Sequence, residues 1–124
     1  EVLEPRRAAA AAALGGQVWL CGGHSGSACL RSVESLEPEA GGWREQPPLQ
    51  VARYSSLAAG LGDKLYVCGG HDGERHLASV ECLDAEKGEW GDGPGLLEGR
   101  LMAAGAVTAE PMPELGATGQ LAAR

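Results

Sequence analysis

Short apolar runs alternate with turns that contain glycine or proline over most of the chain. The glycine pair Gly15-Gly16 joins the first two runs at the length of a β-hairpin turn. The third run alternates apolar and polar residues, as a strand with one buried face does. The pattern therefore predicts four short antiparallel strands in one small twisted sheet. In chain order, these are Ala8–Leu14, Val18–Cys21, Ser32–Leu36 and the run from Trp43 to Pro47-Pro48.

The whole four-strand pattern recurs 47 residues further along the chain. Aligning 6–52 with 53–99 needs no gap and gives 20 identities in the 47 columns. Chance gives about three at ordinary composition, so the repeat is a strong signal. The sequence predicts a second copy of the sheet, with strand runs at Ser55–Leu61, Leu65–Cys68, Ser79–Leu83 and from Trp90 to Pro94.

The alanine run Ala8–Ala13 poses a conflict, because its intrinsic propensity is helical. The second copy has Ser55–Gly60 at the same place, and that segment is a poor helix former. We therefore give the repeat more weight than the propensity. Small side chains also suit the innermost strand of a radial sheet, where neighbouring sheets crowd toward a common axis.

Length and charge exclude several classes of function. A chain of 124 residues is expected to form one small domain. Its net charge of -7 argues against nucleic-acid binding and disfavours anionic membranes. Ala8–Leu14 is the longest apolar run, and it is too short to span a bilayer.

Cysteine usage bears on the redox compartment. No C-x-x-C motif occurs, and two of the cysteines stand at equivalent places in the two copies. We therefore predict free, buried thiols in a reducing, cytoplasmic compartment. An even count would also permit two disulfides in a secreted chain. The cysteines are Cys21, Cys29, Cys68 and Cys82.

Unit length, double glycine, following glutamate and spaced tryptophan together resemble the Kelch repeat. The resemblance implies an all-β fold: an incomplete Kelch-type β-propeller of two four-stranded antiparallel blades plus the opening strand of a third. The combination is most similar to the Kelch-like proteins, which carry a BTB domain and serve as substrate adaptors of cullin-RING ubiquitin ligases. The structural motif residues it implies are Gly22, Gly23, Glu34, Trp43, Gly69, Gly70, Glu81 and Trp90.

The repeat also divides the chain. We predict a lead-in over 1–5, repeat 1 over 6–52, repeat 2 over 53–99 and the start of a third repeat over 100–109. The segment 110–124 departs from the pattern, because Met112-Pro113-Glu114-Leu115 places two prolines in a would-be central strand. Two blades alone would leave apolar outer faces uncovered, so we expect the isolated chain to be marginally folded or to self-associate.

The recurring Cys-Gly-Gly-His has the spacing of a zinc half-site, so a metal-binding role has to be compared with a structural role. Each cysteine ends a strand and each glycine pair is a blade corner in the family, so the structural reading is favoured. Equivalent positions on adjacent blades are about 10 Å or more apart, too far for one tetrahedral site. No glycine loop leads into a helix, and no serine-elbow pattern recurs in the second copy. We predict no catalytic residue, no metal and no cofactor.

Residues at the entry to each innermost strand and in the loops His24–Cys29 and His71–His76 are the candidates for binding a protein partner. The resemblance places them on one face around a central pocket, where arginine would bind acidic side chains by bidentate contacts. The alternative for the repeated arginine is a salt bridge within the propeller, to Glu34 or Glu81. The candidates are Arg6, Ser25, Arg53, Tyr54, Asp72, Arg75 and Arg100.

The predicted function is protein–protein recognition, as the substrate-recognition part of a Kelch-like adaptor. A cullin-RING ligase would be reached only through a BTB domain, which lies outside these 124 residues. Alternatives are an actin-binding or scaffold Kelch protein and a non-functional truncated product. A Kelch-propeller enzyme is disfavoured, because the sequence shows no His/Tyr/Cys copper constellation.

Overall fold

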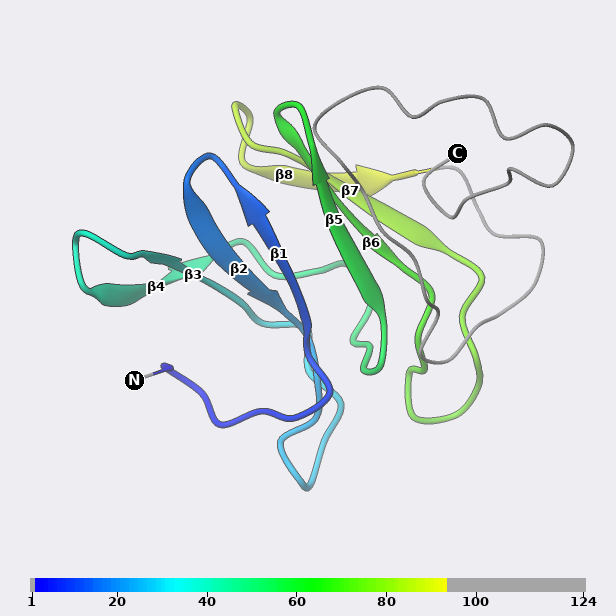
Figure 1. The fold of residues 1–124 in the computed structure, drawn as a ribbon. Coiled ribbons are helices and arrows are strands. Elements are labelled where there is room, and N and C mark those ends of the chain that lie inside the picture. Colours follow the sequence, from blue (N-terminus) through cyan, green and yellow to red (C-terminus); the bar gives the residue numbers. More distant parts are fainter. Residues whose placement is uncertain (1, 94–124) are drawn as a thin grey trace, which may run out of the picture.

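The computed structural model describes residues 2–93 and consists of two antiparallel four-stranded sheets (Figure 1). No helix occurs within that range, so the prediction of two all-β blades is confirmed. The third opening strand, predicted over 100–109, lies outside the described residues. Blade 1 contains β1 (Ala10–Leu14), β2 (Gln17–Cys21), β3 (Val33–Glu37) and β4 (Gly42–Gln46), and blade 2 contains β5 (Leu57–Leu61), β6 (Lys64–Cys68), β7 (Val80–Asp84) and β8 (Glu89–Asp92).

Each blade is a meander whose strands pair in chain order. The register repeats between the blades: Val18 lies opposite Leu36, and Leu65 lies opposite Leu83 at the corresponding positions. The alanine run forms strand β1, which confirms the choice made from the repeat. Its side chains are paired with the bulkier residues of β2, so cross-strand packing outweighs alanine's helical propensity.

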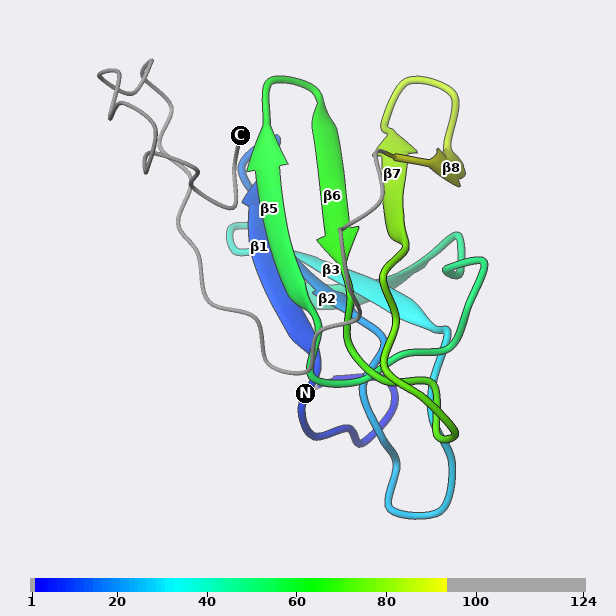
Figure 2. The same ribbon diagram turned by 90° about the vertical axis from the view of Figure 1, so that its right-hand side faces the viewer.

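The two blades meet through their innermost strands, with β1 beside β5 (Figures 1 and 2). A side chain at Gly60 of β5 would collide with the carbonyl oxygen of Ala13 in β1. The two backbones approach closely because most residues of β1 and β5 are alanine or glycine. The small residues of the first run therefore have a packing reason.

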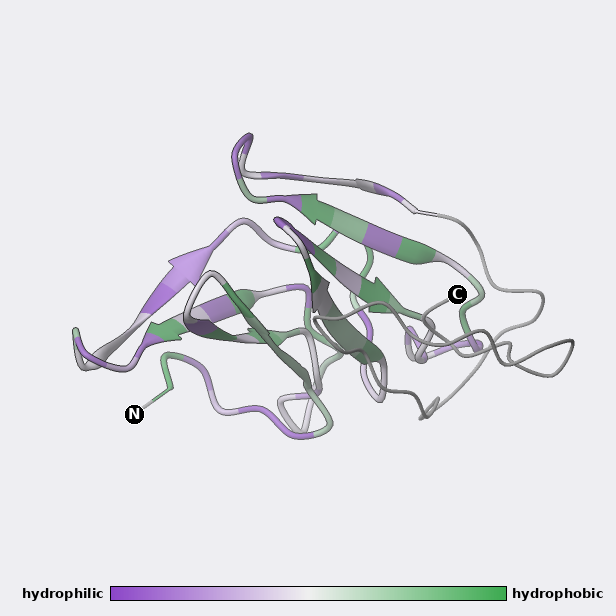
Figure 3. Ribbon diagram, turned by 45° about the horizontal axis from the view of Figure 1, so that its top comes forward, coloured by the Kyte–Doolittle hydropathy of each residue, from purple (hydrophilic) through white to green (hydrophobic). Residues whose placement is uncertain are grey.

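The hydrophobic core lies between the blades. Side chains of β1, β2 and β3 face it from blade 1, and side chains of β6, β7 and β8 face it from blade 2. Figure 3 shows the green apolar segments of both sheets. Fully burying a side chain such as valine or leucine contributes about 1.5–3 kcal/mol to the free energy of folding. The core therefore depends on both blades being present. Its buried members are Ala10, Leu14, Trp19, Cys21 and Val33 from blade 1, Leu49 from the linker, and Leu65, Val67, Leu83 and Trp90 from blade 2.

Because consecutive strands are antiparallel, the connections alternate between the two ends of each blade; in Figure 1 the turns after β1, β5 and β7 lie at the top and the turn after β3 lies at the left. The tight hairpin turns after β1, β3, β5 and β7 lie at one end, which we call the hairpin face. The lead-in 2–9, the β2–β3 loop, the linker 47–56 and the β6–β7 loop lie at the other, which we call the loop face. Over residues 2–93, the fold offers no apolar helix that would reach across a membrane.

The close approach of β1 and β5 can be tested at Gly60. Gly60→Ala should lower the free energy of unfolding by about 1–3 kcal/mol, because the added methyl group displaces β5 from the Ala13 carbonyl. Gly91→Ala in β8 is the matched control, since nothing lies within 4 Å of the methyl group it adds. Urea unfolding measures both. Equal stability of the two variants would contradict the close packing of the inner strands.

Candidate functional site

The repeated arginine is buried inside each blade. In blade 1, Arg6 donates to the Gly22 carbonyl at 2.7 Å and to the Ser32 carbonyl at 2.8 Å. Its second terminal nitrogen donates to Ser32 Oγ at 2.9 Å and to Glu34 Oε2 at 2.8 Å. The side chains of Arg6 and Glu34 are each only 2% exposed.

Blade 2 repeats this network at the equivalent residues. Arg53 donates to the carbonyls of Gly69 (2.9 Å) and Ser79 (3.0 Å). It also donates to Ser79 Oγ (3.0 Å) and pairs with Glu81 Oε2 at 2.8 Å. The Arg53 side chain is fully buried. This corrects the expectation that Arg6 and Arg53 face a ligand: both form the salt bridge that was the alternative. The third candidate of this set, Arg100, lies outside the described residues.

Each glutamate also holds the segment that leads into its blade. Glu81 accepts the backbone N–H groups of Gln50 (2.6 Å) and Val51 (3.1 Å), so it fastens the linker from blade 1 onto blade 2. Glu34 accepts those of Leu3 (2.7 Å) and Glu4 (3.2 Å) in the same way. Charge-assisted bonds of this kind are stronger than neutral ones. Glu34 and Glu81 are therefore structural clamps.

The double glycine Gly22-Gly23 forms a corner of blade 1 that the backbones of Arg7 and Arg53 approach closely. Gly22 and Gly23 both have positive φ, at 66° and 107°. A side chain on Gly22 would collide with the Arg53 carbonyl, and a Cβ on Gly23 would come within 2.7 Å of the Arg7 carbonyl. The Gly23 N–H donates to the Arg53 carbonyl at 2.8 Å. Only glycine meets both the conformational and the steric demands at this corner.

The histidines after the double glycine hold their own loops. His24 Nδ1 accepts the Gly26 N–H at 3.0 Å, and His71 Nδ1 accepts the Gly73 N–H at 2.9 Å. This places the proton of each neutral imidazole on Nε2, so neither nitrogen has a free lone pair for a metal. Burial raises the pKa of the Cys21 thiol to about 12, which opposes the thiolate that zinc requires. Residues 2–93 contain no cluster of three potential metal ligands.

A row of rings runs across the loop face. The Tyr54 ring lies 5.5 Å from the His24 ring in an edge-to-face arrangement and 5.4 Å from the His71 ring. His76 continues the row, 5.1 Å from His71. All three histidines of the chain thus gather here, with the tyrosine of the linker between the two loops. The sequence placed Tyr54 and the loops His24–Cys29 and His71–His76 near the binding surface, but it did not indicate that their rings pack against one another.

The other predicted loop residues close the turns of their loops. Ser25 Oγ accepts the Ala28 N–H at 3.1 Å. Asp72, at the equivalent place, accepts the N–H groups of Glu74 (2.8 Å) and Arg75 (2.9 Å). These backbone hydrogen bonds, that of Arg75 first, hold the pKa of Asp72 below its usual value. Ser25 and Arg75 are exposed, and the Arg75 side chain is 82% exposed.

Arg7 belongs to the loop face, although the sequence analysis did not select it. Its backbone pairs with His24 at 2.9 and 3.0 Å, as that of Tyr54 pairs with His71. Arg7 is exposed and is the repeat counterpart of Tyr54. Arg7 could have been identified from its position directly after the buried Arg6, because the side chain at that position points outward. The next residue in each copy, Ala8 or Ser55, has φ of 54°, which is unusual outside glycine.

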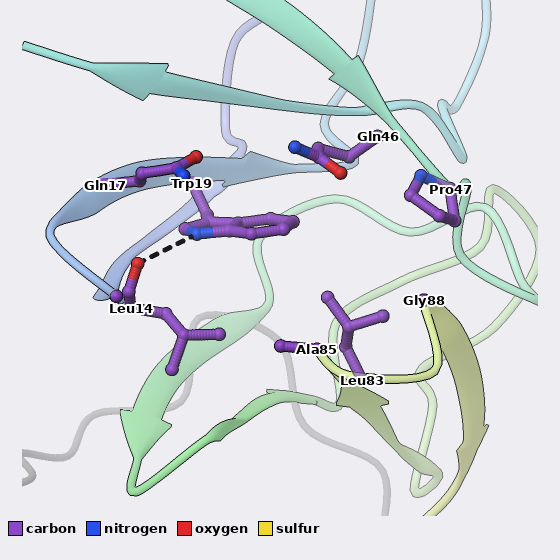
Figure 4. Close-up of a pocket in the computed structure, with 9 residues that line it drawn as sticks. Leu14, Gln17, Trp19, Gln46, Pro47, Leu83, Ala85 and Gly88 are labelled. Carbon is purple, nitrogen blue, oxygen red and sulfur yellow. Dashed lines mark hydrogen bonds between the residues drawn. The ribbon is translucent and has the colours of Figure 1, made fainter.

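A hollow lies between the blades, where the close-up places the Trp19 indole opposite Leu83 and Ala85 (Figure 4). Its volume is about 250 Å³, and the Trp19 indole N–H donates to the Leu14 carbonyl at 3.3 Å. None of the residues lining it carries an ionisable side chain, so it offers no group for acid–base chemistry. The indole of Trp90 also lies between the blades and donates to the Pro47 carbonyl at 2.8 Å. Trp43 lies on the outer face of blade 1 and is half-buried.

Two four-stranded meanders with the same register, clamped by the same buried ion pair, define a protein built from β-propeller blades. Residues 5–50 and 52–96 each match the Kelch motif, and the chain belongs to the Kelch-repeat family. No curated protein matches the chain. Kelch repeats generally mediate binding to protein partners, and their propellers are typically non-enzymatic interaction domains. The four cysteines are free, but only Cys21 is buried; Cys29, Cys68 and Cys82 are half-buried, which corrects the expectation of four buried thiols.

The buried clamp predicts a large stability effect from a single truncation. Arg53→Ala should lower the free energy of unfolding by about 3–5 kcal/mol, because it leaves the Glu81 carboxylate buried without its partner. Arg75→Ala, at the exposed side chain, should change it by less than about 0.5 kcal/mol. Thermal unfolding of both variants is the measurement. An Arg53→Ala protein as stable as the Arg75→Ala protein would contradict the clamp.

The histidine geometry predicts that the Cys-Gly-Gly-His segments bind no zinc. Elemental analysis of protein purified without chelator should find no stoichiometric metal. His24→Ala should leave that result unchanged while loosening the β2–β3 loop, because the Gly26 N–H loses its acceptor. Stoichiometric zinc whose removal unfolds the protein would show that the cysteines and histidines are ligands.

Proposed function

We propose that the chain is the substrate-recognition part of a Kelch-like adaptor for a cullin-RING ubiquitin ligase, and that its loop face binds the partner protein. The observation that carries this proposal is the ring row of His24, Tyr54, His71 and His76. These rings are contributed by two loops and a linker fixed on rigid blades, which is where binding residues concentrate.

The chemistry of the loop face suits a protein surface. Aromatic and arginine side chains supply most hot spots in protein–protein interfaces, and Tyr54 is flanked by histidine rings that limit its rotation. Half-buried rings keep one edge available for contact while their other edge is already packed. A partner would therefore bind without ordering the site first, which lowers the entropic cost of association.

The charges favour an acidic segment in the partner. Arg7 and Arg75 are exposed at the loop face, and each can donate two hydrogen bonds to a carboxylate in bidentate geometry. The hairpin face is more acidic: six carboxylates stand at its turns and strand ends against Lys64 and Lys87, whereas at the loop face Asp72 and Glu74 offset part of the positive charge. An acidic peptide would be repelled there and attracted to the arginines. Those acidic residues are Glu37, Glu39, Asp63, Asp84, Glu86 and Glu89.

The ligase role and the cytoplasmic location complete the proposal. A cullin would be recruited through a BTB domain outside these 124 residues, and the loop face would present the captured substrate for ubiquitin transfer. Four free thiols suit a reducing compartment. The overall acidic charge is compatible with a soluble interaction domain.

The loop face is tested by selecting displayed peptides on the immobilised chain and measuring the best binder by calorimetry. We expect acidic peptides to be enriched, and Tyr54→Ala and Arg7→Ala each to weaken binding about tenfold or more, because each removes a contact worth about 1.4 kcal/mol. Lys87→Ala at the hairpin face is the control and should bind as the unmodified chain does.

Binding that is insensitive to Tyr54 and Arg7, or lost with Lys87→Ala, would contradict a partner site at the loop face. The ligase role has its own readout, which is ubiquitination in cells of a partner bound at this face. A partner that binds there without chain-dependent ubiquitination would favour the scaffold alternative.

A further inference from the structure

The β2–β3 loop and the β6–β7 loop begin with the same hydrogen bond. In blade 1, the Gly26 N–H donates to His24 Nδ1 at 3.0 Å, and in blade 2 the Gly73 N–H donates to His71 Nδ1 at 2.9 Å. The two glycines also have nearly the same positive φ, at 101° and 103°, so both turns share one backbone conformation. Each blade therefore forms this bond in its own loop. We call the histidine–glycine hydrogen bond of each loop its latch.

A latch exists only while its imidazole is neutral. A neutral imidazole carries one proton, which is on Nε2 here because Nδ1 is the acceptor. Nδ1 holds the remaining lone pair, so a second proton must bind there. The imidazolium then directs an N–H group at the N–H group of the glycine, and two donors cannot form a hydrogen bond with each other. Protonation therefore separates each ring from its turn.

The groups around the two rings leave this conflict in place. Tyr54 lies between the rings, and the His76 ring lies 5.1 Å from that of His71. The Asp72 carboxylate attracts a positive charge on His71, whereas a protonated His76 would repel it. Neither group supplies an acceptor for the glycine N–H. The other titratable or charged residues of the segments that pair with the two histidines, within residues 2–93, are Arg7, Cys29, Glu74 and Arg75.

We propose that His24 and His71 form a pH-sensitive device, in which the two latches hold their loops closed at neutral pH and release them when the imidazoles are protonated. Histidine is the side chain whose charge ordinarily changes between about pH 5 and 8. Because both latches have the same donor and acceptor, one change of pH acts on both loops. The bond from the Ala28 N–H to Ser25 Oγ contains no titrating group, so release is confined to the first turn of the loop.

The latches lie in the face that we propose binds the partner, so their effect on binding rests on that proposed function. A peptide selected at neutral pH is fitted to the closed turns, and at acid pH its binding must displace a proton from each latch. Linkage limits the resulting loss of affinity to about tenfold per pH unit for each proton displaced. The charges that the rings gain lie at a solvent-accessible face, where salt screens their attraction for an acidic segment.

Nuclear magnetic resonance of the isotope-labelled chain tests the latches without any partner. Between about pH 8 and 5.5, the amide signals of Gly26 and Gly73 should each shift with the midpoint at which the ring of its own histidine titrates. The Asp72 carboxylate stays charged over this range, because backbone hydrogen bonds hold its pKa below its usual value. Glycine signals that do not follow the ring signals would overturn the proposal.

The matched variant combines His24→Asn with His71→Asn. Asparagine Oδ1 can accept the N–H two residues further on, as Asp72 Oδ1 accepts that of Glu74, but it does not titrate. We therefore expect both glycine signals to be independent of pH in this double variant. His76→Asn is the control, because His76 belongs to the ring row but holds neither glycine, and both signals should still titrate. A pH response that persists in the double variant would overturn the assignment to the latches.

The effect on binding is measured by calorimetry with the acidic peptide selected at neutral pH. Its affinity for the unmodified chain should fall about tenfold or more between pH 7.5 and 5.5. For the double variant the ratio of the two affinities should be close to one, whatever its affinity at pH 7.5. An affinity of the unmodified chain that stays equal or rises at pH 5.5 would overturn the regulation of binding. A peptide that fails to bind at any pH contradicts the proposed function alone, because the glycine signals decide on the latches separately.

Discussion

The buried pair of arginine and glutamate fixes the arrangement of each blade. Its charges are removed from water, which costs several kcal/mol per ion unless every polar group finds a partner. The blade offsets most of this cost with two backbone carbonyls, a serine hydroxyl and the carboxylate around each arginine, and only the arginine Nε is left without a partner. The carboxylate in turn binds the incoming chain. One interaction therefore sets the corner, the third strand and the entry to the first strand together.

The fold was predictable because the same four-strand pattern occurs in two repeats. A single copy left the alanine run ambiguous between helix and strand, and only comparison with Ser55–Gly60 decided the matter. The paired glycines and spaced tryptophans then indicated the blade. The packing of β1 on β5 follows from the absence of large side chains at their crossing, where Gly60 leaves no room for a Cβ.

The site was only partly predictable. A repeated arginine is compatible with a ligand surface or a buried clamp, and the sequence offers no measure of burial that separates the two. Arg7 went unnoticed because its counterpart is Tyr54, so the outward position does not recur as an identity. The ring row escaped for a related reason: His24, Tyr54 and His76 come from three separate segments, and only the folded blades bring their rings together.

Arg53 is shared between the blades in an unusual way. Its guanidinium lies in blade 2, whereas its backbone N–H donates to Leu30 and its carbonyl accepts the Gly23 N–H, both in blade 1. Nearest-neighbour models divide the stability of a repeat protein into the stability of each repeat and that of the interface between neighbours. Arg53 contributes to both. A displacement of Arg53 therefore disturbs the clamp of blade 2 and the corner of blade 1 together. The two repeats are therefore one cooperative unit, and mutational effects measured on either side of Arg53 will not add.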